Sequence, residues 1–437
     1  MNELELKAYF ASLPHPADIT EYLEQTDLSE WPKLLRLIED REIRAEVVAE
    51  IDEAKWRDLL SRLQPPEIAE IIGEMESDDA ADIIAKLPLP LRYETLYRLP
   101  DPKRHQVLVL LGYPEDSAGG IMQVELARVQ ENALVSDAII KVRELVEEDV
   151  PVLAVWVVDK EDRLMGTIEL ADLLIHKSTL GIRALMKPDV ICVRPLVDQK
   201  EVAQLFKKYD LLTLPVVDDE NHLIGRISID DIVDVLTEEA EEDALRMAGT
   251  SAEELIYPEQ VFSTARIRLP WLAVALVCSL ISASLLKLFE PLLHQMTVIY
   301  AFLPVIMAMG GNVGTQSSTI LIRGLATGKS DLSDIPRALF KEIRVGLVMG
   351  IFYGFCAGFV TTFLLSDNNY ALGGIVLTSM VIAMITAAAL GVLAPALLRR
   401  LNIDPAIAAG PFVTTLNDIT GILIYMCTAQ AFRGLLI

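Results

Sequence analysis

Five long apolar stretches in the second part of the chain constrain its fold more than any other feature. Each is near or above the roughly 20 residues that an α-helix needs to cross a bilayer. We therefore expect residues 263–437 to form a transmembrane domain of five helices. The second and fifth stretches contain Gly, Pro, Asn and Thr, which predicts locally irregular backbone that packs against protein or water. The stretches are residues 270–289, 296–322, 345–365, 370–398 and 407–432.

The charge of the chain changes abruptly where this apolar part begins. Residues 1–262 contain 56 Asp and Glu against 27 Lys and Arg, a net charge of −29. Residues 263–437 contain 7 against 11, a net charge of +4, and the two parts sum to the −25 of the whole chain. An acidic soluble part thus precedes a part surrounded by membrane lipid. Because the acidic part would repel phosphates, we expect no nucleic-acid partner.

The Lys and Arg residues near the ends of the apolar stretches indicate the orientation of the chain. Nine of the eleven fall at ends that can lie on one side of the membrane, and only Lys287 and Arg433 fall on the other. Since Lys and Arg concentrate on the cytosolic side, we expect a multi-pass protein of the cytoplasmic (inner) membrane. Its N-terminus would be cytosolic and its C-terminus external. The charged start, MNELELKAYF, lacks the apolar core of a signal peptide, in keeping with this orientation.

Asp418 is the only acidic residue after residue 262 that is predicted to lie deep inside a span. Burying a carboxylate there costs about 2.5 kcal/mol or more, so it should face water, a cation or a partner. A structural carboxylate, protonated or bonded to another helix, is the alternative. Polar and small residues recur at helical spacing in the second and fifth spans, as expected either for a hydrophilic path or for helix–helix contacts. They are Gly311, Asn312, Thr315, Gln316 and Thr319, and Pro411, Thr414, Gly421 and Tyr425.

The donors around Asp418 indicate which ion such a path would carry. No Lys or Arg lies inside a span to neutralise Asp418, and the fifth span contains no His. Oxygen donors favour hard cations such as Mg²⁺ or Ca²⁺, and Mg²⁺ often binds through one or two carboxylates while it keeps its waters. A single Asp per chain suits Mg²⁺ in a homodimer whose pore lies on the two-fold axis, with the second and fifth spans of each chain lining it.

Residues 118–243 contain an internal repeat with an offset of 59 residues. VWVVDKEDRLMGTIELADLL (155–174) aligns with LPVVDDENHLIGRISIDDIV (214–233), and a helical segment precedes each copy. The pattern predicts a β-α-β-β-α unit that occurs twice. It resembles a tandem pair of CBS domains, a module known for binding adenine nucleotides, which brings ATP into consideration as a ligand.

Residues 1–117 predict a compact stack of short helices, because apolar residues at helical spacing alternate with Pro and acidic caps. Acidic residues also pair on single helix faces: Asp78 with Asp82, and Asp231 with Asp234. Such runs are commonly solvated faces, and the residues alone leave open whether these bind metal. The acidic segment 238–262 is expected to be largely helical, as a linker or as a lever between the soluble and membrane parts.

Taken together, the chain resembles the MgtE magnesium channel family over essentially its whole length. The motifs that carry the resemblance are YPEDSAG (113–119), KKYDLLTLPVVD (207–218), GGNVGTQSST (310–319) and GPFVTTLNDITGILIY (410–425). The resemblance implies a multidomain fold with an all-α N domain, α/β tandem CBS domains, a linking helix and a transmembrane domain of five helices. The expected divisions are 1–117 for the N domain, 118–180 and 181–243 for the CBS domains, 244–262 for the linking (plug) helix, and 263–437.

The resemblance also implies two kinds of Mg²⁺ site. In the pore, Asp418 would bind hydrated Mg²⁺, backbone oxygens of Gly410 and Thr414 would face the ion, and Asn312 and Gln316 would line the path. In the cytosol a Mg²⁺ sensor is implied, although Lys200 and Val202 stand where the family has acidic residues, which leaves the number of sensor ions open. The implied sensor residues are Asp78, Asp82, Asp198, Asp210, Asp231, Asp234, Glu239, Glu242 and Asp243.

The expected function is import of Mg²⁺ through a homodimeric channel or transporter that closes when cytosolic Mg²⁺ binds the acidic N and CBS domains. A broader divalent cation transporter for Mn²⁺ or Co²⁺ and a proton-coupled transporter are the alternatives. An intramembrane metalloprotease would need H-E-x-x-H on a span. None of the five His residues is followed by Glu, so we expect no enzyme.

Overall fold

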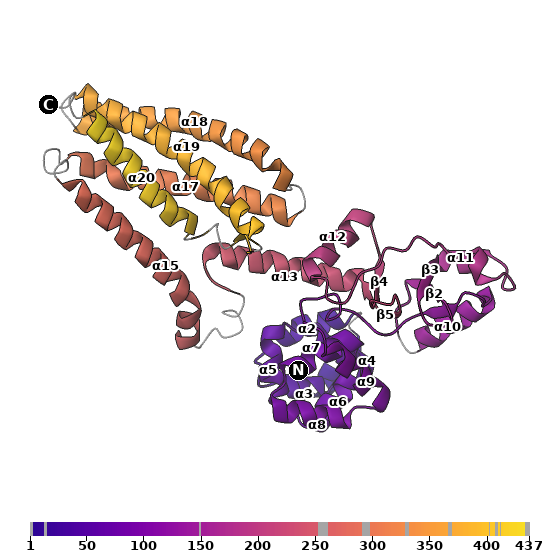
Figure 1. Cartoon of the computed structure of the whole chain (residues 1–437). Coiled ribbons are helices and arrows are strands. Elements are labelled where there is room, and N and C mark those ends of the chain that lie inside the picture. The colour runs from indigo at the N-terminus through magenta and orange to yellow at the C-terminus, as the bar shows by residue number, and fades with distance from the viewer. Residues whose placement is uncertain are drawn as a thin grey trace. The chain divides into compact units, whose positions relative to one another are not determined.

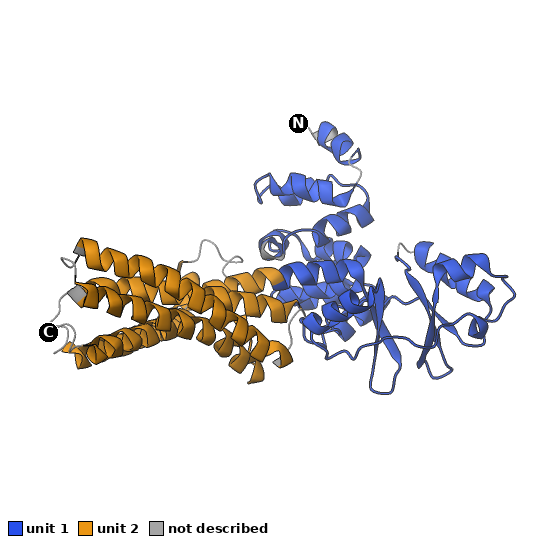
Figure 2. Cartoon of the chain, turned by 90° about the horizontal axis from the view of Figure 1, so that it is seen from above, with its two compact units in different colours: residues 1–239 blue, residues 240–437 orange. Residues whose placement is uncertain are grey.

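The computed structural model describes most of the chain. The described residues are 3–12, 15–147, 150–251, 261–290, 298–327, 332–365, 369–401, 403–406, 410 and 412–432. The chain divides into two compact units, residues 1–239 and 240–437, which are coloured separately in Figure 2.

The first unit begins with short helices packed around a large apolar core, which confirms the predicted all-α N domain (Figure 1). Pro occupies the first turn of several of them, as in α6 and α8, because the missing N–H is not needed there and the fixed φ suits a helix start. Trp31, Leu59 and Ile68 are fully buried in this core. The helices are α1 Glu3–Phe10, α2 Pro16–Glu24, α3 Trp31–Leu35, α4 Arg41–Ala49, α5 Glu53–Leu60, α6 Pro65–Glu74, α7 Ser77–Lys86, α8 Leu89–Arg98 and α9 Asp101–Leu110.

The two CBS repeats follow, and they differ in their first strand. The first repeat has a three-stranded sheet in which β1 pairs parallel to β2 and β2 antiparallel to β3. In the second, β4 and β5 form an antiparallel pair, and the expected first strand is reduced to a bridge between Val193 and Val216. The elements are β1 Arg128–Gln130, α10 Val135–Glu147, β2 Ala154–Val158, β3 Leu164–Glu169, α11 Leu170–Ile175, η1 Ile182–Ala184, α12 Gln199–Tyr209, β4 Thr213–Val217, β5 Leu223–Ser228 and α13 Ile229–Ala248.

The two strand–turn–strand hairpins contact each other through equivalent turns. Asp162 and Asn221, which are 59 residues apart, both adopt the left-handed conformation, with φ of 61° and 70°. The backbone N–H of Leu164 donates to Asn221 O (2.9 Å), and that of Leu223 donates to Asp162 O (3.0 Å). The repeat seen in the sequence is therefore a repeat in backbone conformation as well.

The second unit consists mainly of long helices. Three of the described helices are long and apolar enough to cross a membrane: Val261–Leu288, Ile335–Leu364 and Tyr370–Arg400. That α17 and α20 also cross it stays a prediction. The irregular backbone expected in the second stretch is absent from the described residues, because α17 is one continuous helix despite Pro304. The elements are α15 Val261–Leu288, α17 Val298–Ala326, η2 Leu332–Asp334, α18 Ile335–Val360, η3 Thr361–Leu365, α19 Tyr370–Arg400 and α20 Val413–Ala431.

Glycines allow the helices of this unit to approach closely. Gly346, Gly350, Gly354 and Gly358 recur every fourth residue on the face of α18 that packs on α19. A Cβ added at Gly350 would lie 2.8 Å from the Cα of Val381. Small residues give this kind of contact between membrane helices, where burial of apolar surface provides little driving force.

Helix α13 runs through the predicted boundary at 243/244. It is one helix from Ile229 to Ala248, so the last helix of the second CBS repeat continues directly into the predicted linking segment. Residues 252–260 of that segment lie outside the described part of the chain.

Candidate functional site

Acidic residues gather where α7 of the N domain and α13 of the second CBS repeat begin. Asp78 and Asp79 lie in the first turn of α7, and Asp230 and Asp231 in the first turn of α13. Helix N-termini carry a partial positive charge that favours carboxylates. Four predicted sensor residues belong to this acidic cluster, and the structure adds three that the sequence did not single out. The cluster comprises Asp78, Asp82, Asp231 and Asp234, together with Glu76, Asp79 and Asp230.

Burial makes several carboxyl groups of this cluster hard to ionise, because it raises their pKa. It raises the pKa of Glu76 and of Asp79 to about 7 and that of Asp231 to about 6. Asp78 is 6% exposed, and burial, followed by the charge of Asp231, holds its pKa well above the usual range. Within the described residues, Asp78 Oδ1 has no hydrogen-bond partner. The cluster therefore favours binding of a cation or of protons.

The segment before β1 links α7 to β5, the strand that leads into α13, beside this cluster. Ser77 Oγ donates to Glu125 Oε2 (2.6 Å) and accepts from the backbone N–H of Val124 (3.1 Å). Arg226 Nε of β5 donates to the backbone oxygen of Glu125 (3.2 Å). The charges of Arg226 and Lys103 lower pKa values within the cluster, but the net shifts remain upward. The carboxylate oxygens of the cluster keep a net negative charge, and oxygen ligands of this kind suit Mg²⁺.

Two other predicted sensor residues lie at opposite ends of α12. Asp198 is the N-cap, where its Oδ1 accepts from the backbone N–H of Lys200 (2.8 Å). Asp210 is the C-cap, in the left-handed conformation with φ of 51°. At about 1.5 Å per residue, α12 separates them by roughly 18 Å. Within one chain, the structure does not bring these two carboxylates together.

Glu239 lies beside the first turn of α12 and has partners there. It accepts a hydrogen bond from Gln199 Nε2 (2.9 Å), and its Oε2 lies 2.5 Å from Lys200 Nζ. Lys200 is one of the positions where the resembled family has an acid. In this chain, an ammonium group therefore already neutralises Glu239, one of the implied sensor residues.

Further along α13, Glu242 forms an ion pair with Arg246, and Asp243 follows Glu242. Arg246 also forms an ion pair with Asp404, which lies between α19 and α20. Asp404 Oδ1 in turn accepts the backbone N–H of Ala406 (2.8 Å). The end of α13 is thus bound to the segment that leads into α20.

The next residue of α13 contacts the same end of the membrane part. Met247 packs against Ile322 of α17 and against Ala406. A Cβ added at Gly410 would lie 2.5 Å from the backbone oxygen of Met247, so only glycine allows this approach. Gly410, a predicted pore residue, therefore lies directly against the end of α13.

Thr414, a predicted pore residue, lies at the contact between α17 and α20. Thr414 Oγ1 lies 3.4 Å from Thr315 Oγ1 and donates to the backbone oxygen of Gly410 (3.3 Å). Asp418 follows one turn later on α20 and is partly buried. Among the described residues, we find no hydrogen bond or ion pair to its carboxylate. Asn312 and Gln316 of α17 are exposed in the single chain.

Glu342 is a buried carboxylate in the membrane part, although its position in the sequence predicted that it lies beside a loop. It is 7% exposed, because α18 begins at Ile335, ten residues before the predicted stretch. Its Oε2 accepts from Ser317 Oγ (2.8 Å), and Lys341 Nζ lies 3.3 Å from its Oε1. Unlike Asp418, Glu342 therefore has both a hydrogen-bond donor and a cation beside it.

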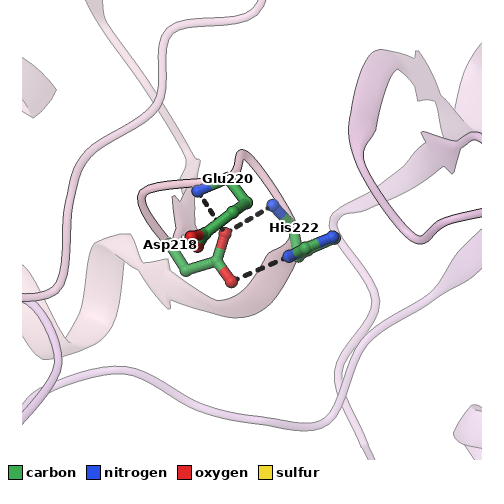
Figure 3. Close-up of side chains that lie close together, drawn as sticks. All are labelled: Asp218, Glu220 and His222. Atoms are coloured by element: carbon green, nitrogen blue, oxygen red, sulfur yellow. Dashed lines mark hydrogen bonds and ion pairs between the residues drawn. The ribbon is translucent and has the colours of Figure 1, made fainter.

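The turn between β4 and β5 brings together Asp218, Glu220 and His222, a group that the sequence did not single out (Figure 3). Their ligand atoms lie within 4.8 Å of one another. Asp218 accepts from the backbone N–H groups of Glu220 (3.1 Å) and His222 (2.7 Å). In the first repeat, Asp159 accepts from the backbone of Arg163 (2.9 Å) in the same way without a histidine. We interpret the Asp as the cap of a turn that both repeats share.

Taken together, an acidic soluble part and long apolar helices with polar groups between them are typical of a membrane transporter of cations. The models of three families match: a divalent cation transporter over residues 303–428, the MgtE intracellular N domain over 14–116, and a CBS domain over 182–238. Two curated relatives are named "Magnesium transporter MgtE". The protein from Thermus thermophilus is 36% identical over 74% of this chain and 71% of its own length. The protein from Bacillus subtilis is 35% identical over the same shares. The chain belongs to the MgtE family.

Two solved structures resemble the soluble part. The soluble part of a magnesium transporter is 28% identical, with a TM-score of 0.51, and the match covers 55% of this chain and 93% of that one. The cytosolic domain of the Mg²⁺ channel MgtE, in complex with ATP, is 29% identical, with a TM-score of 0.50 and coverage of 52% and 93%. Both are consistent with the helical N domain followed by CBS domains.

Proposed function

We propose that this chain imports Mg²⁺ across the cytoplasmic membrane and catalyses no reaction. The observation that carries the proposal is Asp418. It is the only charged residue of α20 and has no described partner, and it lies one turn after Thr414, whose hydroxyl oxygen is 3.4 Å from that of Thr315. A carboxylate in that position is costly unless it meets water or a cation. Oxygen donors without His or Cys favour a hard divalent ion that keeps its waters.

The pore is formed by two chains, in this proposal, with the second and fifth spans of each along the two-fold axis. Asn312 and Gln316 support it, since exposed amides on an apolar helix are unfavourable against lipid. The backbone oxygens of Gly410 and Thr414 would face the ion at the cytosolic end. The N-terminus is then cytosolic and the C-terminus external, and the five-part domain division stands as part of the same proposal.

Cytosolic Mg²⁺ closes this channel by binding the acidic cluster. Mg²⁺ would neutralise the carboxylates of α7 and α13 and hold the N domain against the second CBS repeat. The end of α13 would then stay at the pore, through the Arg246–Asp404 ion pair and the approach of Met247 to Gly410. A ligand shifts such an equilibrium only by its difference in affinity for the two states. Several ions acting together would give firm closure.

The alternatives are transport of Mn²⁺ or Co²⁺ and coupling to protons. ATP at the CBS domains is also proposed, because the similar cytosolic domain was solved with ATP. The implied sensor residues outside the acidic cluster would need ions that bridge separated residues, and Lys200 already pairs with Glu239. These residues are Asp198, Asp210, Glu239, Glu242 and Asp243.

Flux in reconstituted vesicles tests the proposal. Mg²⁺, Mn²⁺, Co²⁺ and Ca²⁺ are supplied in turn, with the membrane potential and the pH gradient set independently. Mg²⁺ flux that follows the potential, and that Asp418→Ala abolishes without loss of the dimer, is expected. Flux that follows the pH gradient would favour the coupled transporter, and wild-type flux through Asp418→Ala would refute the pore assignment.

Gating is tested by limited proteolysis of the purified full-length protein across a Mg²⁺ titration. Protection of the 238–262 segment should appear cooperatively. Asp231→Asn combined with Asp234→Asn should move the midpoint to higher Mg²⁺, since two ligands are lost. Cleavage that is indifferent to Mg²⁺ in the wild type would mean that these acids are only a solvated face.

A further inference from the structure

The amide of Asn417 occupies the space that a side chain at Gly314 would fill. A Cβ added at Gly314 would lie 1.8 Å from Asn417 Nδ2 and 3.1 Å from Val413 Cγ1. Asn417 is 1% exposed, so its side chain has little room to turn away. The contact joins α20 to α17 one residue before Asp418.

On its other side, α17 is held by α19 at the same level. A Cβ added at Gly391 would lie 2.4 Å from the backbone oxygen of Gly314 and 2.9 Å from Ser317 Cβ. The backbones of α17 and α19 already touch there, so α17 has no room to move away from Asn417. Three helices thus meet at Gly314.

The contact between Asn417 and Gly314 depends on the fit of their shapes and not on hydrogen bonding. Neither Oδ1 nor Nδ2 of Asn417 has a hydrogen-bond partner among the residues that the structure describes. A buried amide without partners costs free energy, so hydrogen bonding does not explain its position. A short planar side chain fits the hollow beside Gly314, where a longer one would force the helices apart.

We propose that Asn417 is a positioning residue that fixes the height and rotation of α20 on α17, and so the direction of Asp418. Successive residues of a helix are turned by about 100°. With Asn417 seated against Gly314, Asp418 and Thr414 are directed consistently, and Thr414 meets Thr315. The inference rests on the proposed function, because it takes Asp418 as the ion-binding residue.

The test reads helix register and ion transport separately. Thr315→Cys and Thr414→Cys are introduced into the full chain with its four native Cys replaced by Ser or Ala. The hydroxyl oxygens of the two threonines lie 3.4 Å apart, so the two thiols should cross-link readily on oxidation. Mass spectrometry measures the cross-linked fraction. Gly314→Ala should slow this cross-linking by about tenfold, because overpacking moves the helices. Gly314→Ala combined with Asn417→Ala should restore the cross-linking rate to within about threefold of the parent protein, because the smaller side chain at 417 leaves room for the added methyl group.

Transport is read in vesicles as the half-saturating Mg²⁺ concentration and the maximal flux. Gly314→Ala should raise the half-saturating concentration by about tenfold, which a simple loss of folded protein would not do. The double variant should restore it. Asn417→Gln overfills the same space from α20 and should therefore behave like Gly314→Ala. If the Gly314→Ala protein cannot be purified, Asn417→Gln takes its place. Gly374→Ala is the control, because nothing lies within 4 Å of an added Cβ there.

Unchanged cross-linking in both Gly314→Ala and Asn417→Gln would overturn the proposal. So would failure of Asn417→Ala to rescue Gly314→Ala. If cross-linking follows the prediction while the wild type carries no Mg²⁺, the proposed function fails and the register role of Asn417 stands.

Discussion

In the first unit, the buried Asp78 lies close to the half-buried Asp79 and Asp231, whereas in the second unit Asp418 has no acidic neighbour among the described residues. Crowded carboxylates repel one another, and a cation that binds among them removes that repulsion. Because the carboxylates belong to two domains, the bound cation also holds those domains together. Within one chain, Asp418 has no neighbouring acid whose repulsion a bound ion could relieve. It attracts one ion at a time, which suits passage better than regulation.

The largest effect is expected where one charge acts alone. Asp418→Asn keeps the size of the side chain and removes its charge. We expect Mg²⁺ flux to fall at least about 100-fold, because removing one partner of a buried charge pair costs about 3–5 kcal/mol. Glu342→Gln is the matched control, since Glu342 already has Ser317 and Lys341 beside it. Flux in vesicles that fell equally in both variants would contradict a special role for Asp418.

A smaller effect is expected where several charges share one task. Asp78→Asn removes the most buried charge of the cluster, whose Oδ1 has no described partner. The full-length protein without Mg²⁺ should become more stable, and the stabilisation gained on adding Mg²⁺ should shrink. We expect the Mg²⁺ midpoint for protease protection to rise about tenfold, or about 1.4 kcal/mol. Thermal unfolding with and without Mg²⁺ checks the first part. An Asp78→Asn protein that is less stable than the wild type without Mg²⁺ would contradict this prediction.

The same crowding predicts a dependence on pH. Burial raises the pKa of Glu76 and Asp79 to about 7 and that of Asp231 to about 6. These groups hold protons more tightly in the folded state, so their contribution to stability is full below about pH 4 and is lost as the pH rises through 6 to 7. Mg²⁺ must displace those protons.

The Mg²⁺ midpoint for protease protection should therefore be about tenfold higher at pH 6 than at pH 8, and binding should release protons. A pH-stat measures that release directly. In the Asp78→Asn protein, both the release and the difference between the two midpoints should be smaller. Equal midpoints at the two pH values in the wild type would mean that the cluster is already ionised before Mg²⁺ binds.

Much of the fold of the two units could be predicted from the sequence. The 59-residue repeat predicted two equivalent strand–turn–strand units, and the structure has left-handed residues, Asp162 and Asn221, at equivalent positions in them. Helical spacing also placed Asp78 with Asp82 on one face. The part that Glu76 plays was missed, since it depends on α7 docking against α13, which lies some 150 positions later in the chain.

In the membrane part, the sequence located Asp418 but not the surroundings of the other polar groups. Glu342 was placed beside a loop because the third stretch was read from hydropathy alone. Asp334 and Pro336 mark an earlier helix start, and that signal was available. The position of Asn417 was not predictable in this way, because its contact is defined by a missing Cβ on a different helix.

The smallest effect is expected where the chain has supplied its own cation. Lys200 Nζ lies 2.5 Å from Glu239, and this pair is 40% and 16% exposed in its side chains. Lys200→Glu would remove that cation and add a carboxylate beside Glu239. The Mg²⁺ midpoint for protection should then fall by about threefold, in the range of about 0.2–1 kcal/mol that partly exposed pairs contribute. Lys207→Glu, in the last turn of the same helix, changes the net charge equally and should leave the midpoint unchanged. If both variants shift it alike, the effect is that of overall charge, and Glu239 takes no part in binding Mg²⁺.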